Sequence, residues 1–437
     1  MNYFKYDIKK HNYILFSSFQ GTEDSISIWH SLYRFLRRYI SACGREENKH
    51  IKYPSPHPIL FLANTKNNAR ALRPIYNSIS DEANFIDDPD EPYYFPLHRI
   101  YADSWLFSYK SIWLYLNSNA RERAVIRRFF ETFFTTIGLM KQAKRLLTHF
   151  SPRMVVMAND HSVIQKCFIT LAGENSTDTM YLQHCSVTER FPALQFTYSF
   201  LDGEESWDKY RNIGETKGTI YVSGSPRFDC LAEYKREKTE SNKLGLAINE
   251  EDNEELVKNL CLRLHESGIE EIVLRPHPRQ TLHETAWYKA HNIEISDSKT
   301  ENPFEYLGRI KMLIASESGI HLDAAMMGVY SICYSLTGRK AIDWYSYIKN
   351  GLVPNAETTE ELLELLQPEH VTPIEKLQEK AQWYNASYGR ETNGHVGEMV
   401  ADFLRHYLDG SIAEFDRKYG FVVKEQTENY TIKVYDK

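Results

Sequence analysis

Two short polar stretches follow apolar runs and carry residue types suited to holding a phosphate. The first is Arg275-Pro276-His277-Pro278-Arg279, directly after the apolar run 272–274. The second is Ser316-Glu317-Ser318-Gly319, after the run 312–315 and before a helical pattern. In open α/β sheets ligands bind beyond the carboxyl ends of strands, and helix N-termini offer free N–H groups to phosphates. The spacing therefore predicts half of a nucleotide-donor site within residues 273–328.

His277 is the strongest candidate in this region. A residue between two prolines is held in an extended turn and does not easily join a helix. Arg275 and Arg279 flank it, and guanidinium and imidazole groups would neutralise charge on a leaving nucleotide. A loop histidine that caps the next helix is the alternative. The position between a strand and a helix favours the phosphate site.

The serine-rich turn has two compatible interpretations. Ser316 and Ser318 have the residue type of N-caps for a helix that begins near residue 320. A bound phosphate could take over that capping role through the hydroxyls and nearby N–H groups, including that of Gly319. Asp323 lies about one turn into the helix. It either reaches ribose hydroxyls or serves as a first-turn acid that favours the helix dipole.

The first half of the chain supplies candidates for a general base. Asp160 and His184 each follow a predicted strand, and a base must lie within hydrogen-bond reach of the acceptor hydroxyl. The alternatives are a helix N-cap for Asp160 and a structural hydrogen bond for His184. Glu23 and Asp24 are weaker base candidates, because an exposed loop explains them equally well.

Alternating apolar and amphipathic segments must position these residues. We expect an α/β fold with two Rossmann-like domains facing a cleft, of the GT-B type. Domain boundaries are expected at 1–225 for an acceptor-binding domain, 226–410 for a donor-binding domain and 411–437 for a tail, with a charged connection at 233–242. The predicted strands are 12–17, 59–63, 154–158, 179–182, 196–201, 219–222, 244–248, 271–274, 312–315 and 330–334, with a late strand at 430–435.

A long basic helix is predicted over 120–150, after another helix at 104–116. Its phenylalanines and arginines fit a core helix with a solvated basic face. They also fit a surface that rests on anionic lipid or receives an anionic, lipid-linked acceptor. Both interpretations remain open at this point.

Composition narrows the class of protein. The chain has 437 residues, 42% of them hydrophobic, with a net charge of −7. That charge argues against general nucleic-acid binding. The six cysteines are scattered without Cys-x-x-Cys, and no signal sequence or membrane span is evident, so a cytoplasmic protein with reduced thiols is expected. No motif calls for a P-loop, a metal ion or a cofactor.

An ordered set of motifs carries a family resemblance. Asn159-Asp160 precedes Gln183-His184-Cys185, then Gly224-Ser225-Pro226-Arg227-Phe228-Asp229, Arg275-Pro276-His277-Pro278 and the serine-rich turn ending in Leu322-Asp323. The set resembles bacterial GT-B transferases that build capsule, teichoic-acid and lipopolysaccharide chains. Within them it is similar to the CDP-glycerol glycerophosphotransferase-like and sialyl- or Kdo-transferase-like groups. Cys185 stands where the family usually has Gly, and Ser318-Gly319 stands in place of Ser-Ser.

The resemblance implies that His277 and Ser318 hold the donor phosphate, that Asp323 lies near the ribose, and that His184 or Asp160 activates the acceptor. It implies transfer of a sugar or polyol-phosphate unit from a cytidine-nucleotide donor to a glycan or lipid-linked glycan, with peripheral contact at the inner face of the cytoplasmic membrane. Two other functions stay open. One is a non-hydrolysing sugar-nucleotide epimerase of the same fold, and the other is a non-catalytic scaffold of a glycan assembly complex.

Overall fold

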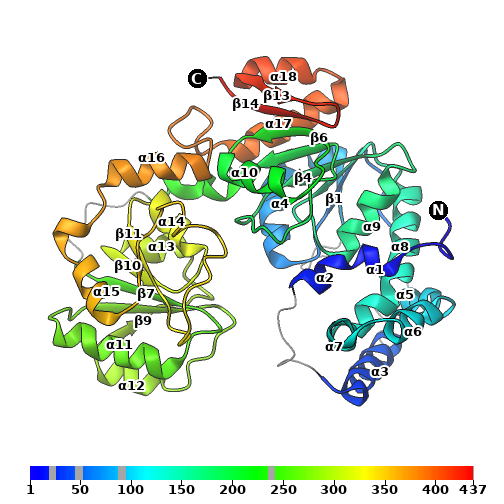
Figure 1. Cartoon of the computed structure of the whole chain (residues 1–437). Coiled ribbons are helices and arrows are strands. Elements are labelled where there is room, and N and C mark those ends of the chain that lie inside the picture. The colour runs from blue at the N-terminus through cyan, green and yellow to red at the C-terminus, as the bar shows by residue number, and fades with distance from the viewer. Residues whose placement is uncertain (19–25, 45–52, 87–94, 235–241, 437) are drawn as a thin grey trace.

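The chain folds around two separate β-sheets (Figure 1). The computed structural model describes residues 1–18, 26–44, 53–86, 95–234 and 242–436. Within them the first sheet has eight strands in the order β13-β14-β6-β5-β4-β3-β1-β2, all parallel except the β13–β14 pair. Its strands are β1 (Ile59–Leu62), β2 (Ala83–Ile86), β3 (Met154–Met157), β4 (Asp178–Leu182), β5 (Tyr198–Leu201), β6 (Gly218–Val222), β13 (Phe421–Gln426) and β14 (Tyr430–Tyr435).

The second sheet is parallel throughout its described strands, in the order β12-β11-β10-β7-β8-β9. These are β7 (Leu244–Ile248), β8 (Ile272–Pro276), β9 (Ile293–Ile295), β10 (Met312–Ala315), β11 (Tyr330–Tyr334) and β12 (Asn355–Ala356). Parallel strands covered on both faces read as continuous apolar runs, which is why the sequence locates them well. The predicted bounds of β7, β10 and β11 are confirmed to the residue.

Helices cover both faces of each sheet. Alternate residues of β1 point to opposite sides: Leu60 packs in the cluster that contains α8, and Phe61 packs in the cluster that contains α17. The helices with the main packing or connecting roles are α4 (Lys66–Ser78), α7 (Ala120–Arg128), α8 (Phe130–Phe150), α9 (Val163–Ala172), α10 (Glu204–Ile213), α11 (Glu254–Glu266), α12 (Thr285–Ala290), α13 (Pro303–Gly308), α14 (Ile320–Met326), α15 (Thr359–Leu365), α16 (Ile374–Tyr384), α17 (Val396–Asp409) and α18 (Ile412–Tyr419).

The predicted strand at 12–17 is wrong. That stretch forms helix α2 (Tyr13–Ser18), which follows helix α1 (Ile8–His11) after the C-cap residue Asn12. A short apolar run does not by itself distinguish a strand from a helix. The preceding helix α1 is capped by the Asp7 side chain, which accepts from the backbone N–H groups of Lys9 and Lys10. Glu23 and Asp24 lie outside the described residues, as do most of the predicted connection and the acidic stretch 87–92.

The predicted helix 120–150 is two helices, α7 and α8, with the break at Phe129. Phe133 and Phe134 are buried. Arg145 forms an ion pair of 2.7 Å with Asp103, and Arg123 donates to the last carbonyl groups of α6 (Ser108–Leu116). These contacts match the core-helix interpretation. Among the described residues, no helix is both long enough and apolar enough to cross a bilayer.

The end of the chain differs from the expected tail. After α16, residues 396–435 return to the first sheet, where β14 pairs with β6 in parallel and α17 packs beside α4 (Figure 1). The late strand at 430–435 is confirmed as β14. Its partner lies about two hundred residues earlier, because Ile432 pairs with Ile220. Local sequence carries no signal for such a pairing.

If β14 belongs to the core, Ile432→Ala should lower the free energy of unfolding by about 2–4 kcal/mol, since the side chain is fully buried. Val423→Ala on β13 is the matched control. Its side chain is 53% exposed, so its cost should stay below about 1 kcal/mol. Urea unfolding followed by fluorescence measures both, and equal midpoints for the two variants would show that the last strands are not part of the cooperative unit.

Candidate functional site

Four neighbouring strands of the first sheet deliver polar residues at the same edge. Asp160 follows β3, His184 follows β4, Asp202 follows β5 and Arg227 follows β6. The carboxyl ends of parallel strands share one edge of a sheet, so these side chains come together although up to 67 residues separate them. Asp160 and His184, the two candidate bases, are thus part of a larger polar cluster.

Asp160 is buried and holds two partners. Its Oδ1 lies 2.7 Å from Nδ1 of His161, and its Oδ2 accepts a hydrogen bond of 2.7 Å from the Tyr210 hydroxyl. The His161 ring is partly exposed and lies against Phe191. A carboxylate that binds one imidazole nitrogen fixes the ring, and the other nitrogen, Nε2, has only a long contact of 3.4 Å with the Asn159 side-chain amide, which a substrate hydroxyl could replace. Asp160 and His161 therefore form an oriented acid–base pair.

His184 lies in the same electrostatic environment. Burial lowers its pKa to about 4, against a weaker opposing effect of Asp160. The imidazole is therefore neutral at pH 7 and can accept a proton. Its Nδ1 is buried without a hydrogen-bond partner among the described residues. Burial also raises the pKa of the adjacent Cys185 to about 12, which keeps that side chain a thiol.

Arg227 connects this cluster to the second sheet. Its Nη2 lies 2.5 Å from Oδ1 of Asp323, on α14. Burial raises the pKa of Asp323, and the Arg227 charge opposes that effect. The predicted ribose ligand is thus held by an arginine of the first half, and its role toward ribose stays a prediction.

Asp202 is the most strongly perturbed carboxyl of the cluster. Burial raises its pKa to about 7, although the Arg227 charge acts in the opposite direction. Its Oδ1 has no hydrogen-bond partner among the described residues. A carboxyl that changes charge near neutral pH can donate or accept a proton during a reaction.

Of the expected donor ligands, His277 and Arg279 form one group with Glu250. Oε1 of Glu250 lies 3.2 Å from Nδ1 of His277 and 2.7 Å from Nε of Arg279. The His277 side chain is 37% exposed at the end of β8. Burial lowers its pKa despite the nearby Glu250. The group is accessible and carries both signs of charge.

Arg275 and Ser316 are engaged within the protein. Arg275 is buried and donates to the Ser296 hydroxyl at 2.8 Å and to the carbonyl of Glu301 at 2.9 Å. Ser316 is also buried and donates to Asp252 at 2.6 Å. Both side chains brace the loops around the expected site, and their contact with a phosphate stays a prediction.

Ser318 and Gly319 lie at the start of α14, which begins at Ile320 as predicted. The Ser318 hydroxyl accepts weakly from the backbone N–H of Ile320, at 3.4 Å. Apart from Gly319 itself and its chain neighbours, no heavy atom of the described residues lies within 4 Å of the position that a Cβ would take at Gly319. The turn therefore presents open space beside partly exposed polar groups.

One loop joins the two halves close to this turn. Glu317 accepts from the backbone N–H groups of Ile342 and Trp344, each at 2.8 Å. The Trp344 ring lies 4.0 Å from the Arg190 guanidinium of the first half. Tyr347 and Ser186 share a hydrogen bond of 2.6 Å. The serine-rich turn is thus tied to the loop that follows β4.

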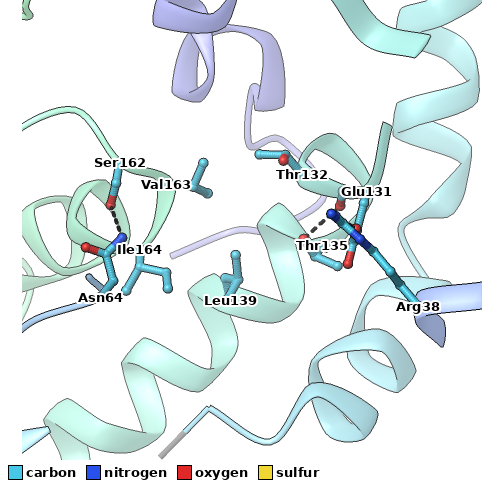
Figure 2. Close-up of a pocket in the computed structure, with 9 residues that line it drawn as sticks. All are labelled: Arg38, Asn64, Glu131, Thr132, Thr135, Leu139, Ser162, Val163 and Ile164. Atoms are coloured by element: carbon cyan, nitrogen blue, oxygen red, sulfur yellow. Dashed lines mark hydrogen bonds and ion pairs between the residues drawn. The ribbon is translucent and has the colours of Figure 1, made fainter. Parts of the chain in front are cut away.

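A pocket of about 310 Å³ opens at the start of α9, where Ser162 and Val163 line it. Asn64 and Ser162 lie at one end, joined by a hydrogen bond of 3.1 Å, and the Arg38–Glu131 ion pair lies at the other (Figure 2). Thr132 and Thr135 of α8 lie at the Arg38–Glu131 end, and Leu139, Val163 and Ile164 form an apolar middle (Figure 2). Hydroxyl, amide and charged groups of this kind suit a polyhydroxylated ligand.

The sequence analysis missed His161, Asp202 and Arg227 as site residues. Each lies in a polar segment that directly follows a predicted strand. Position after one of these neighbouring strands was therefore the signal that could have identified them. For Arg227 the signal was also its place in the Gly224–Asp229 motif.

Solved structures share this architecture. A putative UDP-N-acetylglucosamine 2-epimerase from Listeria monocytogenes is 12% identical with a TM-score of 0.53, over 82% of this chain and 98% of that chain. The S. aureus MnaA–UDP co-structure is 13% identical with a TM-score of 0.52, over 81% and 97%. The wall teichoic acid polymerase TagF aligns at 15% identity over 87% of this chain and 98% of that chain, with a TM-score of 0.48.

No family model and no curated protein matches the chain. The first two structures have TM-scores of 0.53 and 0.52, but at sequence identities of 12% and 13% this similarity establishes the fold alone. The chain has the GT-B fold, with two Rossmann-like α/β domains.

Asp202 gives the stability of the protein a defined pH dependence. Its carboxyl ionises near pH 4 in the unfolded chain and near pH 7 in the fold, so the folded state binds more protons between these values. Asp202 therefore makes the wild type less stable as pH rises through this window, and Asp202→Asn lacks that loss. The variant should gain on the wild type by up to about 4 kcal/mol between pH 4 and pH 7.

Urea unfolding at several pH values measures this difference. Asp208→Asn, on the exposed side of α10, is the control and should follow the wild type at every pH. A difference between Asp202→Asn and the wild type that does not change with pH would contradict the buried, protonated carboxyl.

Proposed function

We propose that this chain is a GT-B transferase. It moves a sugar or polyol-phosphate unit from a cytidine-nucleotide-activated donor, a CMP-sugar or CDP-polyol, to a bacterial surface polysaccharide such as capsule, teichoic acid or lipopolysaccharide. The observation that carries the proposal is the oriented Asp160–His161 pair beside a neutral His184, whose protonation also feels the charge of Arg227 in the Arg227–Asp323 ion pair. It combines a base for an acceptor with charge for a leaving phosphate.

The proposed reaction is a single displacement. The acceptor hydroxyl oxygen forms a bond to the transferred unit while the bond to the nucleotide phosphate breaks, and that electron pair leaves with the nucleotide. The hydroxyl proton passes to an imidazole. Both Asp160 oxygens already have partners, so Asp160 would orient His161, and His161 or His184 would take the proton.

On the donor side, the nucleotide phosphate would bind at the open turn Ser318-Gly319 and at the exposed His277. The space beside Gly319 allows a phosphate to approach the backbone closely. The His277 side chain is accessible and stands at a strand end of the second sheet, where ligands bind in open α/β folds. Arg227 would contribute positive charge from the other half, as Arg–phosphate interactions commonly do.

The acceptor would enter from the first half. The pocket lined by Asn64, Ser162 and Thr135 offers hydrogen-bond partners for a glycan or the glycan of a lipid-linked intermediate. Ser162, which lines the pocket, directly follows His161 in the sequence, and His161 is one of the two proposed bases. The protein would work in the cytoplasm, at the inner face of the membrane.

A sugar-nucleotide epimerase is the second candidate, and Asp202 favours it. An epimerase needs carboxyl groups that exchange protons around the sugar, and Asp202 changes charge near pH 7. An epimerase would convert its sugar nucleotide without any acceptor, whereas a transferase would release nucleotide only when an acceptor is present. A non-catalytic scaffold would do neither.

A nucleotide screen tests the donor class. CMP or CDP at about 100 times its dissociation constant should stabilise the protein by about 2.7 kcal/mol, a rise in Tm of several degrees. His277→Ala should reduce the shift, while His370→Ala, on the exposed side of the second half, should leave it unchanged. Stabilisation by UDP alone would rule out the cytidine donor and favour the epimerase.

Turnover of variants tests the base. His161→Gln or His184→Gln should lower kcat by about 10²- to 10⁴-fold if that residue takes the proton. The nucleotide-induced Tm shift should stay, because neither residue is placed on the donor. His370→Gln is the control. Full turnover of both variants with the donor that the screen identifies would contradict the assignment of the base, and full turnover of His277→Ala would contradict the donor site.

A further inference from the structure

The outer helices of the first half expose a large apolar surface. Helix α3 (Ile28–Gly44) lies at the edge of the molecule, away from both sheets (Figure 1). Trp29, Tyr33, Leu36 and Ile40 are 77%, 62%, 52% and 68% exposed. Their spacing of four, three and four residues puts them on one face of the helix. The opposite face holds Phe35, which is buried, so the exposed stripe is not needed for packing.

A second exposed set continues this stripe on neighbouring helices. It comprises the end of α5 (Leu97–Trp105) and the outer face of α6: Trp105, Leu106, Tyr109, Ile112, Trp113 and Leu116, each at least 48% exposed. The Trp105 ring lies 6.1 Å from Tyr39 of α3, which joins the two sets. We call the two sets together the apolar face. Soluble monomers rarely expose a continuous apolar surface of this extent without a partner.

The charge around the apolar face identifies the kind of partner. Residues 28–44 and 97–128 hold nine arginines and lysines against two carboxylates, a net charge of +7, in a chain whose total is −7. Helix α3 itself has three arginines and no carboxylate. Tryptophan, tyrosine and arginine around an apolar stripe match the interface of an anionic bilayer. A symmetric contact between two copies would bring this positive charge against itself.

We propose that the apolar face docks the protein on an anionic membrane, with α3 and α6 lying in the headgroup region. The face is independent of the transfer chemistry, since it contains none of the residues placed at the reaction. Arg38 stands on α3 and also lines the end of the pocket that lies opposite Asn64 and Ser162 (Figure 2). Docking therefore places the mouth of that pocket close to the membrane surface, from which a lipid-linked acceptor would enter.

Vesicle flotation of the full chain tests the proposal. Vesicles of phosphatidylcholine with one-quarter phosphatidylglycerol should bind the protein, and vesicles of phosphatidylcholine alone should bind at least fivefold less. The triple variant Trp29→Ser, Leu36→Ser, Ile40→Ser should lose binding at least tenfold. The variant Arg34→Gln, Arg37→Gln should lose binding to the anionic vesicles severalfold and should reduce its salt dependence.

The control is a triple variant of exposed apolar residues elsewhere, Ile342→Ser, Ile374→Ser, Val423→Ser, which should bind as the wild type does. The proposal would be overturned if the α3 triple variant bound anionic vesicles as the wild type does, or if the control variant lost as much vesicle binding as the α3 variant. A third outcome would also overturn it: the wild type is a dimer in sedimentation velocity, the α3 triple variant is a monomer, and the wild type does not bind vesicles. If the α3 variant does not fold, as judged by circular dichroism, the arginine variant decides: unchanged binding to anionic vesicles overturns docking. Turnover with a soluble acceptor does not require membrane docking, so it tests the proposed function alone. Vesicle binding does not require turnover, so it tests docking alone.

Discussion

The part-buried ion pair between Arg227 and Asp323 is the interaction on which the arrangement of the site depends. The Asp323 side chain is only 11% exposed, so its carboxylate needs the partner charge that the 32% exposed Arg227 guanidinium supplies. Because one comes from the end of β6 and the other from α14, their pairing fixes the edge of the first sheet against the turn that starts α14. The Arg227 charge also acts on Asp202, Asp323 and Cys185, so the protonation of the whole cluster is coupled to it.

The fold was largely readable from the sequence, and the reason is physical. Strands buried on both faces are continuous apolar runs, so β7, β10 and β11 were located to the residue. Residues 12–17 were misassigned because six residues of mixed polarity do not define a period, and a strand and a short helix then have the same local signal. The pairing of β14 with β6 had no local signal. The C-terminal residues are mostly polar, which favours an exposed tail, and their strand partner β6 lies far away in the sequence.

The site was only partly readable. Asp160, His184 and the turn at Ser318 stand at strand ends, as their position after apolar runs indicated. The contacts across the site could not be predicted. The ion pair of Arg227 with Asp323, for example, joins residues 96 positions apart in the sequence. His161 follows Asp160 directly, yet only the folded geometry shows that the carboxylate holds its ring. The GT-B fold itself is shared by epimerases and transferases, so the chemistry has to be argued from these side chains.

The return of the chain to the first sheet has a topological consequence. The second sheet and its helices form an insertion, whose entry near Asp229 and exit near Val396 are clasped together: the Asp229 carboxylate accepts from the backbone N–H groups of Val396 at 3.0 Å and Gly397 at 2.7 Å. Nearby, Ser225 N–H donates to Asn385 at 2.9 Å. A module held by two adjacent crossings rotates about that clasp instead of swinging freely on a single tether. Opening and closing of the two halves is thereby reduced to one hinge-like motion, and that motion must move Arg227 and Asp323 relative to each other.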